Sequence, residues 1–135
     1  MSQVGNRYAL STATEHGFEE AVARVRAELA QDGFGVLCEV DVQATLKQKL
    51  GAEREPYLIL GACNPPLAHR ALEAEPELGV LLPCNVVVYT QDGDTRIAAV
   101  DAERMLSIVG NPELAEIAAD VRARLEGVVE RAARS

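Results

Sequence analysis

The sequence is poor in aromatic residues and in cysteine, and it has no tryptophan. Aromatic side chains make up only 4% of its 135 residues, so the core has to be built from aliphatic side chains and alanine. No segment approaches the roughly 20 continuous apolar residues that a membrane-spanning helix requires. Residues 1–7 contain no charged stretch followed by an apolar run, so the sequence predicts neither a signal peptide nor a membrane partner.

Basic residues are also in short supply. Lysine and arginine together number 13 against 21 aspartates and glutamates, which gives a formal net charge of -8. A surface that binds nucleic acid needs basic residues to neutralise phosphates, so this charge argues against a nucleic-acid partner and against an anionic membrane surface. Three cysteines, an odd number, in a chain without a signal peptide are typical of reduced thiols. We therefore expect a cytoplasmic protein.

The remaining composition is ordinary for a globular protein. Hydrophobic residues make up 48% of the chain and charged residues 25%. A chain of this length buries roughly two-thirds of its unfolded surface without disulfides or metal ions. The sequence contains no linker, low-complexity tract or clear internal repeat. Residues 1–135 are therefore predicted to form a single domain.

Hydrophobic periodicity predicts about five strands and four or five helices. Thr12 and Glu15 have the spacing of a capping box, ahead of a helical stripe that runs from Phe18 to Leu29 and ends before Gly33. Strands are expected at 4–10, 36–42, 57–63, 80–89 and 95–100, and further helices at 42–50, 65–75, 101–109 and from 112 towards the C-terminus.

Two local features decide the predicted fold class. The dipeptide Asp92-Gly93 is typical of a tight hairpin between consecutive strands. Pro83 lies inside an apolar run, and proline cannot donate to a sheet ladder, so this strand is expected to be an edge strand, or to break or bulge at Pro83. The hairpin and the short connections favour an α+β fold, with a mostly antiparallel sheet covered by helices on one face, over a doubly wound sheet.

Two cysteines in similar settings form the best candidate site. Residues 61–66 (GACNPP) end one apolar run, and residues 81–86 (LLPCNV) begin the next. Asparagine followed by proline suits the N-cap and first position of a helix. Cys63 would then precede a helix N-terminus, whose free N–H groups favour a thiolate. Alternatively, Cys63 is a small buried residue, because residues 110–112 (GNP) repeat the same helix start without a cysteine.

The second cysteine, Cys84, is predicted to lie on the apolar face of its strand. Asn85 would lie on the opposite face, where its amide needs a hydrogen-bond partner. If the two strands are neighbours, Cys63 and Cys84 approach each other and form a disulfide, bind a metal, or do neither. The candidates for a ligand-binding or reactive-thiol site are Cys63, Asn64, Cys84 and Asn85.

No complete catalytic constellation is present, so the sequence leaves open whether the protein is an enzyme. Cys38 is expected in the core and His69 in solvent. A metal site would have at most three ligands, Cys63, Cys84 and His69, without the CxxC or HxxxH spacing of zinc sites, and no metal is predicted. No glycine-rich phosphate-binding motif occurs, so the cofactor, if any, is unknown.

Residues 33–46 (GFGVLCEVDVQATL), 57–65 (YLILGACNP) and 81–89 (LLPCNVVVY), together with 110–112 (GNP), resemble the bacterial and archaeal family called domain of unknown function 302. The resemblance covers nearly the whole chain. It implies a fold like that of the TATA-box-binding protein, a curved antiparallel sheet with helices, and it makes a homodimer plausible. It implies neither DNA binding nor an activity. The family motifs include Cys63, Asn64, Cys84 and Asn85.

Two hypotheses about function follow. The first is a small-ligand or redox-active thiol site, with Cys63 as the reactive group, Cys84 as its partner, and Asn64 and Asn85 as polar positioning groups. The second is a non-enzymatic homodimeric module, in which the same motifs cap a helix and shape a strand. Fast reaction of Cys63 with a thiol reagent near neutral pH would favour the first, and protection of all three cysteines would favour the second.

Overall fold

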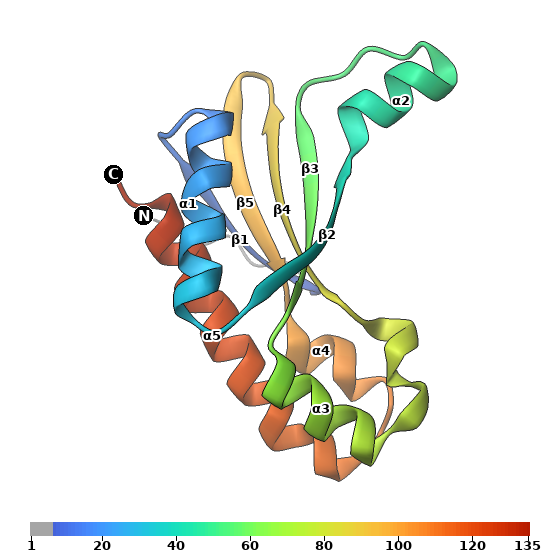
Figure 1. Cartoon of the computed structure of the whole chain (residues 1–135). Coiled ribbons are helices and arrows are strands. Elements are labelled where there is room, and N and C mark those ends of the chain that lie inside the picture. Colours follow the sequence, from blue (N-terminus) through green and yellow to red (C-terminus); the bar gives the residue numbers. More distant parts are fainter. Residues whose placement is uncertain (1–6) are drawn as a thin grey trace.

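A computed structural model describes residues 7–135, and within them it contains one antiparallel sheet of five strands (Figure 1). The strands are β1 (Ala9–Thr14), β2 (Gly35–Asp41), β3 (Tyr57–Cys63), β4 (Cys84–Gln91) and β5 (Asp94–Val100). Their order across the sheet is β1-β5-β4-β3-β2, so β1 and β2 are the edge strands. The predicted α+β class is confirmed. The likeness to the TATA-box-binding protein stays an expectation.

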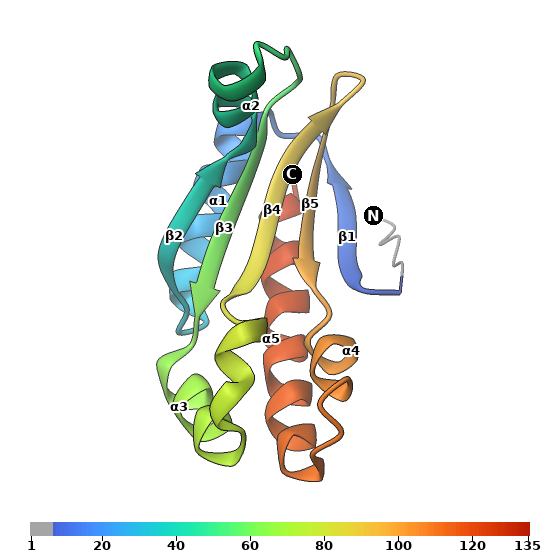
Figure 2. The same cartoon turned by 90° about the vertical axis from the view of Figure 1, so that its right-hand side faces the viewer.

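The helices lie on one face of the sheet and at both of its ends. They are α1 (Phe18–Gln31), α2 (Val42–Leu50), α3 (Pro65–Ala74), α4 (Ala102–Ser107) and α5 (Ala115–Ala133), with 3₁₀ helices η1 (Pro76–Leu81) and η2 (Pro112–Leu114). Helices α1 and α5 cover the same face (Figure 1). Helices α3, η1 and α4 gather beyond the end of the sheet at which β3 finishes (Figure 2). Within residues 7–135, no helix is long and apolar enough to cross a membrane.

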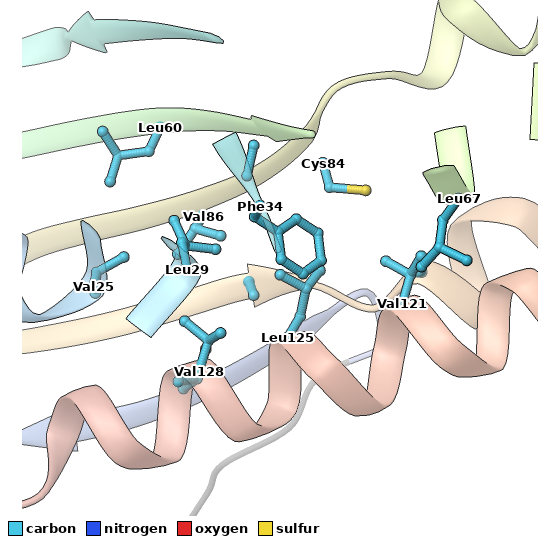
Figure 3. Packing of buried hydrophobic residues seen from close by; sticks show 14 of the residues in the cluster. Val25, Leu29, Phe34, Leu60, Leu67, Cys84, Val86, Val121, Leu125 and Val128 are labelled. Carbon is cyan, nitrogen blue, oxygen red and sulfur yellow. The ribbon is translucent and has the colours of Figure 1, made fainter. Parts of the chain in front are cut away.

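The core lies between the sheet and the helices α1 and α5. Alternate residues of the central strands point into it: Val86 and Val88 of β4 and Ile97 of β5 are fully buried. Leu125 and Val128 of α5 are also fully buried, and they face these strands in Figure 3. Burying one such aliphatic side chain contributes about 1.5–3 kcal/mol. This packing fixes α5 against the sheet.

Several predicted helix ends are confirmed. Gly33 follows α1 with φ of 82°, and Gly51 follows α2 with φ of 68°, in the left-handed region where glycine is favoured. The carboxylate of Asp101 caps α4, because its Oδ1 accepts hydrogen bonds from the N–H groups of Glu103 and Arg104. These ends depend on local chemistry alone, which is why the sequence indicates them.

The predicted N-terminal strand and the capping box of α1 are wrong in position. Residues 4–6 of the expected strand lie outside the described residues, and the observed strand begins later, at Ala9. Thr12 lies inside it, paired with Ile97 of β5 and buried, so it cannot cap a helix. Helix α1 instead begins at Phe18 after Gly17, without a side-chain cap. The pairing of distant strands therefore overrode the local capping signal.

Of the alternatives predicted for the strand that contains Pro83, an edge position is excluded. Strand β4 lies between β5 and β3, in the interior of the sheet. It begins at Cys84, directly after Pro83, and the peptide bond from Leu82 to Pro83 is cis. Pro83 therefore lies outside the hydrogen-bonded ladder of β4, so its lack of a backbone N–H breaks no hydrogen bond of the sheet. Of the predicted alternatives, the structure has the break in the strand.

Candidate functional site

An apolar pocket of about 310 Å³ lies at the end of the sheet near α3. Three of the four candidate residues line it: Cys63, Asn64 and Cys84. The rest of its wall is hydrocarbon from β2, α3, η1, α4 and α5, including Phe34, Leu67, Leu78, Leu82, Leu106 and Val121. None of the described residues that line it has a charged side chain. The strands and helices thus bring two thiols and one amide together in an otherwise apolar space.

Cys63 is positioned by the end of β3. It is the last residue of that strand, it pairs with Gly35 of β2, and it is half-buried. The next residue, Asn64, is the N-cap of α3. Cys63 therefore precedes a helix N-terminus, as predicted, and its thiol belongs to the pocket wall. All three cysteines of the chain are free thiols.

Asn64 is buried and uses both ends of its side-chain amide. Its Oδ1 accepts a hydrogen bond from the N–H of Leu67 at 3.3 Å, which caps α3. Its Nδ2 donates to the main-chain carbonyl of Asp32, at the end of α1, over 3.3 Å. Because the oxygen and the nitrogen of the amide each have a partner within the protein, the Asn64 side chain is held in place and ties α3 to the end of α1.

Asn111 makes the same two kinds of contact elsewhere in the chain: it caps one helical segment and bonds to the end of another. It caps η2 through Oδ1, which accepts from the N–H of Glu113 at 2.9 Å. Its Nδ2 donates to the carbonyl of Ala74, at the end of α3, over 3.2 Å, and to Glu75 Oε1 over 3.0 Å. Each asparagine before a proline thus starts one helical segment and holds it to the end of another. The motif itself is structural, as the repeated GNP segment suggested.

Cys84 is the first residue of β4 and points into the core side of the sheet. It is 8% exposed, and Figure 3 shows its sulfur between Phe34 and Leu67. Burial, together with the smaller effect of the neighbouring Cys63, raises the pKa of the Cys84 thiol from the ordinary 9.0 to about 11. Cys84 is therefore a neutral thiol at pH 7, which makes it an apolar contact and a poor nucleophile.

Asn85 is not part of this pocket. It is exposed on the opposite face of the sheet, the face that Val87 and Tyr89 share with it, as the alternation predicts. There it lines a separate shallow hollow. The four candidate residues therefore divide into three in the pocket and one on the other side of the sheet.

A family model described as "Domain of unknown function DUF302" matches residues 10–132. The chain belongs to the DUF302 family. It is similar to a solved structure, the crystal structure of the uncharacterized conserved protein DUF302 from Bacillus stearothermophilus, with 35% identity and a TM-score of 0.87. The likeness covers 93% of this chain and 98% of that one. None of the curated proteins matches the chain.

In this DUF302 chain, the prediction that Cys38 lies in the core is wrong. The pairing of β2 with β3 shifts between Val36 and Cys38, so the two side chains no longer share a face. Val36 packs against the core, whereas Cys38 is exposed over Gly61 of β3. A Cβ on Gly61 would lie only 2.6 Å from the Sγ of Cys38. The absence of a side chain at Gly61 is what allows this arrangement.

Other residues with potential chemistry stand apart from the pocket of this DUF302 domain. His69 is exposed on α3, as predicted, with its Nε2 at 3.7 Å from Glu73 Oε1. His16 precedes α1, and its Nε2 is 2.5 Å from the carbonyl of Arg134. Within residues 7–135, no three His, Cys, Asp or Glu side chains are grouped so that they could hold a metal ion.

The sequence did not identify most of the pocket wall. Leu106 and Val121 come from the C-terminal part of the chain, and Leu78 and Leu82 come from the segment between α3 and β4. In the sequence these residues are recognisable only as apolar, and apolar character does not distinguish a pocket wall from the core. One feature could have pointed to the pocket: the 80–82 segment (VLL) is apolar but is followed by proline, so it cannot simply extend the strand.

Proposed function

We propose that this DUF302 domain binds a small, uncharged, apolar molecule in the pocket that Cys63, Asn64 and Cys84 line. The observation that carries this proposal is the pocket itself, which joins the two cysteine motifs in one space of about 310 Å³. Ligand pockets are commonly about 300–1,000 Å³, mostly apolar, with a few polar groups that orient the ligand. The volume falls at the lower end of that range and favours a small ligand.

The wall chemistry favours binding over catalysis. The described residues lining the pocket include no carboxylate, imidazole, amine or guanidinium that could act as a general acid or base. A charged ligand would lose its hydration and find no partner of opposite charge. Sulfur is polarisable and packs well against apolar and aromatic groups. The two thiols therefore suit a hydrocarbon or aromatic ligand.

The two thiols have different roles in this proposal. Cys84, neutral and buried, contacts the ligand as part of the apolar wall. Cys63, half-buried beside the start of α3, is the thiol open to reagents that enter the pocket. The redox hypothesis is weaker, because a thiol with a pKa of about 11 is a poor thiolate source near neutral pH.

The proposal is tested by titration with N-phenyl-1-naphthylamine, a neutral dye that fluoresces in apolar surroundings. Wild-type protein should give saturable fluorescence, and saturating dye should slow the alkylation of Cys63 by N-ethylmaleimide. Ala68 lines the pocket, so Ala68→Leu should weaken dye binding at least tenfold. Ala27→Leu, on the exposed side of α1, should leave it unchanged. Equal binding by the two variants, or no saturable signal, would refute the proposal.

A second function is favoured by a different observation, the uncovered face of the sheet. Figures 1 and 2 show α1 and α5 on one face only. Among the described residues, the outward positions of the inner strands on the other face carry mostly apolar side chains, which are half-buried in the single chain. We propose that the chain is a homodimer.

Three free thiols fit a reducing compartment, so we also propose the cytoplasm as the location of the protein.

A further inference from the structure

The sheet face opposite α1 and α5 has an unusual composition for a surface in contact with water. An antiparallel sheet with one solvated face normally alternates apolar side chains inward with polar side chains outward. Here the outward positions of the three inner strands are largely apolar. We call this surface the open face and define it by Tyr57, Ile59, Val87, Tyr89, Ala98 and Val100.

The hollow on the open face has the tyrosine content and the lack of carboxylates that are typical of a protein interface. All three tyrosines of the chain, Tyr8, Tyr57 and Tyr89, line this shallow hollow of about 860 Å³. The rings of Tyr57 and Tyr89 stack with centroids 5.3 Å apart. None of the described residues lining the hollow is a carboxylate, although the chain has a net charge of -8. Interface cores are rich in tyrosine and poor in acidic residues.

Helix α2 is a second feature without a partner in the single chain. None of its residues is buried, and Leu50 at its end is 75% exposed. In Figure 1, α2 extends beyond the sheet on the side away from α1 and α5, which is the side of the open face. The helix begins at the carboxylate of Asp41, which caps it, and it is well formed. Val42 and Leu46 are half-buried against the sheet edge, so Leu50 is the apolar side chain of α2 that is free to contact another chain.

We infer that the open face docks against the open face of a second copy of this chain, with α2 of each copy reaching over the other. This inference rests on the proposed homodimer and adds the surface and the orientation. Five strands at their usual spacing, each six to eight residues long, present roughly 500 Å² on one face. A standard interface needs about 800 Å² per partner, and the additional surface of α2 brings the total near that size.

Charge fixes the orientation of the two copies. At the hairpin end of the open face, three carboxylates (Glu55, Asp92 and Asp94) outnumber two arginines (Arg54 and Arg96). Arg7 and Arg104 lie at the opposite end, near α4. A two-fold axis that lies between the two faces, perpendicular to the strands, runs the two sheets in opposite directions and places the arginine end of one copy over the aspartate end of the other. The reverse orientation would bring like charges together. The same patch thus complements itself, as a two-fold interface requires.

Light scattering and sedimentation at micromolar concentration test the inference. The wild-type chain should be a dimer. Val87→Asp puts a carboxylate in the centre of the open face and should give monomers that keep the wild-type circular dichroism. Val80→Asp is the matched control: Val80 is 86% exposed on η1, away from the open face, and this variant should stay dimeric. If the Val87→Asp variant stays dimeric, the open face is not the dimer interface, although the chain is still a homodimer.

A charge exchange tests the orientation without a change in the apolar surface. Arg104→Asp should raise the dimer dissociation constant at least fivefold at low salt, and Asp94→Arg should do the same. The double variant restores the pairing with reversed signs, so it should bind within about twofold of the wild type. Additive losses in the double variant would overturn the orientation. A monomeric wild-type chain would overturn the homodimer itself and leave the open face to a different protein.

Discussion

The side-chain amide of Asn64 donates to the main-chain carbonyl of Asp32 and so ties the start of α3 to the end of α1. The same side chain accepts from the N–H of Leu67, and Arg124 of α5 donates to the same Asp32 carbonyl at 3.2 Å. Three helices therefore meet at one carbonyl group. Cys63, the residue before Asn64, is held at the pocket by this junction.

Replacement of Asn64 should show whether this junction positions the thiol. Asn64→Ala removes the cap and the bond to Asp32, and it should lower the free energy of unfolding by about 1–2 kcal/mol. It should also change the alkylation rate of Cys63, because the helix start that positions this thiol at the pocket loosens. Urea unfolding and mass spectrometry of each cysteine measure the two effects.

Asn111→Ala is the matched control for this prediction. Asn111 caps η2 and bonds to the end of α3 in the same manner, but no cysteine precedes it. The loss of stability should be similar, and the alkylation rate of Cys63 in the folded protein should not change. If both variants alter Cys63 equally, the effect comes from general loosening of the fold, and the junction has no specific role at the thiol.

Cys63 and Cys84 should differ in their reaction with N-ethylmaleimide at pH 7.4. Cys84 is 8% exposed, and its pKa is raised to about 11, so it offers little thiolate and little access. Cys63 is half-buried at the pocket and should be labelled first. Peptide mass spectrometry gives the two rates, and labelling in urea shows that both thiols react once the chain unfolds. Faster labelling of Cys84 would contradict the assigned roles.

The raised pKa of Cys84 should appear in the pH dependence of stability. The folded state keeps the proton until about pH 11, whereas the unfolded thiol releases it near its ordinary value of 9.0. Between these values the unfolded state binds fewer protons, so the free energy of unfolding should fall as pH rises, by at most about 1.4 kcal/mol per pH unit. Below pH 9 this contribution is fully present.

Other groups titrate in the same range, so a variant is needed to isolate the thiol. Cys84→Ala is expected to be less stable at every pH but to have a shallower decline between pH 9 and 11. The difference between the two slopes, from urea unfolding at several pH values, is the contribution of Cys84. Parallel curves would mean that the thiol has no raised pKa in the folded protein.

Leu125 tests the docking of α5. Its side chain is fully buried against the sheet, so Leu125→Asp would place an unpaired charge in the core and should cost about 3 kcal/mol or more. Ala123→Asp, two residues earlier on the exposed side of the same helix, adds the same charge outside the core. Thermal unfolding should separate the two variants clearly, and equal melting temperatures would contradict the observed packing.

Features that depend on a few neighbouring residues could be predicted from the sequence. The cap of α3 is one example, because Asn64 bonds to Leu67, three residues away. The turn at Asp92-Gly93 is another, because the chain reverses within two residues. The alternation that places Asn85 opposite Cys84 needs only the strand to be regular. These predictions used short-range chemistry, and the structure confirms them.

Features that depend on strand pairing could not be predicted. Cys38 seemed to share a face with Val36, but the shift in pairing with β3 turns it to the other side of the sheet. Pro83 seemed to mark an edge, but the strand begins one residue later and lies in the interior. The pocket could not be foreseen either, since its wall combines segments as distant as Phe34 and Val121. The sequence identified its thiols but not the space they share.

Gly61 gives the sharpest test of that pairing. A Cβ at this position would lie 2.6 Å from Cys38 Sγ and 2.8 Å from Pro83 Cγ, both shorter than normal contacts. Gly61→Ala should therefore lower the free energy of unfolding by about 1–3 kcal/mol, as overpacking does. Gly79→Ala is the control, because nothing lies within 4 Å of its added Cβ, and its effect should be small.

The double variant Gly61→Ala, Cys38→Ala separates the two contacts. Removal of the sulfur relieves the closer one, while the contact with the Pro83 ring remains. Urea unfolding should therefore show partial recovery: less stability than Cys38→Ala alone, but a smaller loss on adding Gly61→Ala than in the wild-type background. Such a coupling is expected only for residues in direct contact. Independent effects of the two substitutions would mean that Cys38 does not lie over Gly61, and that the shift in pairing is placed wrongly.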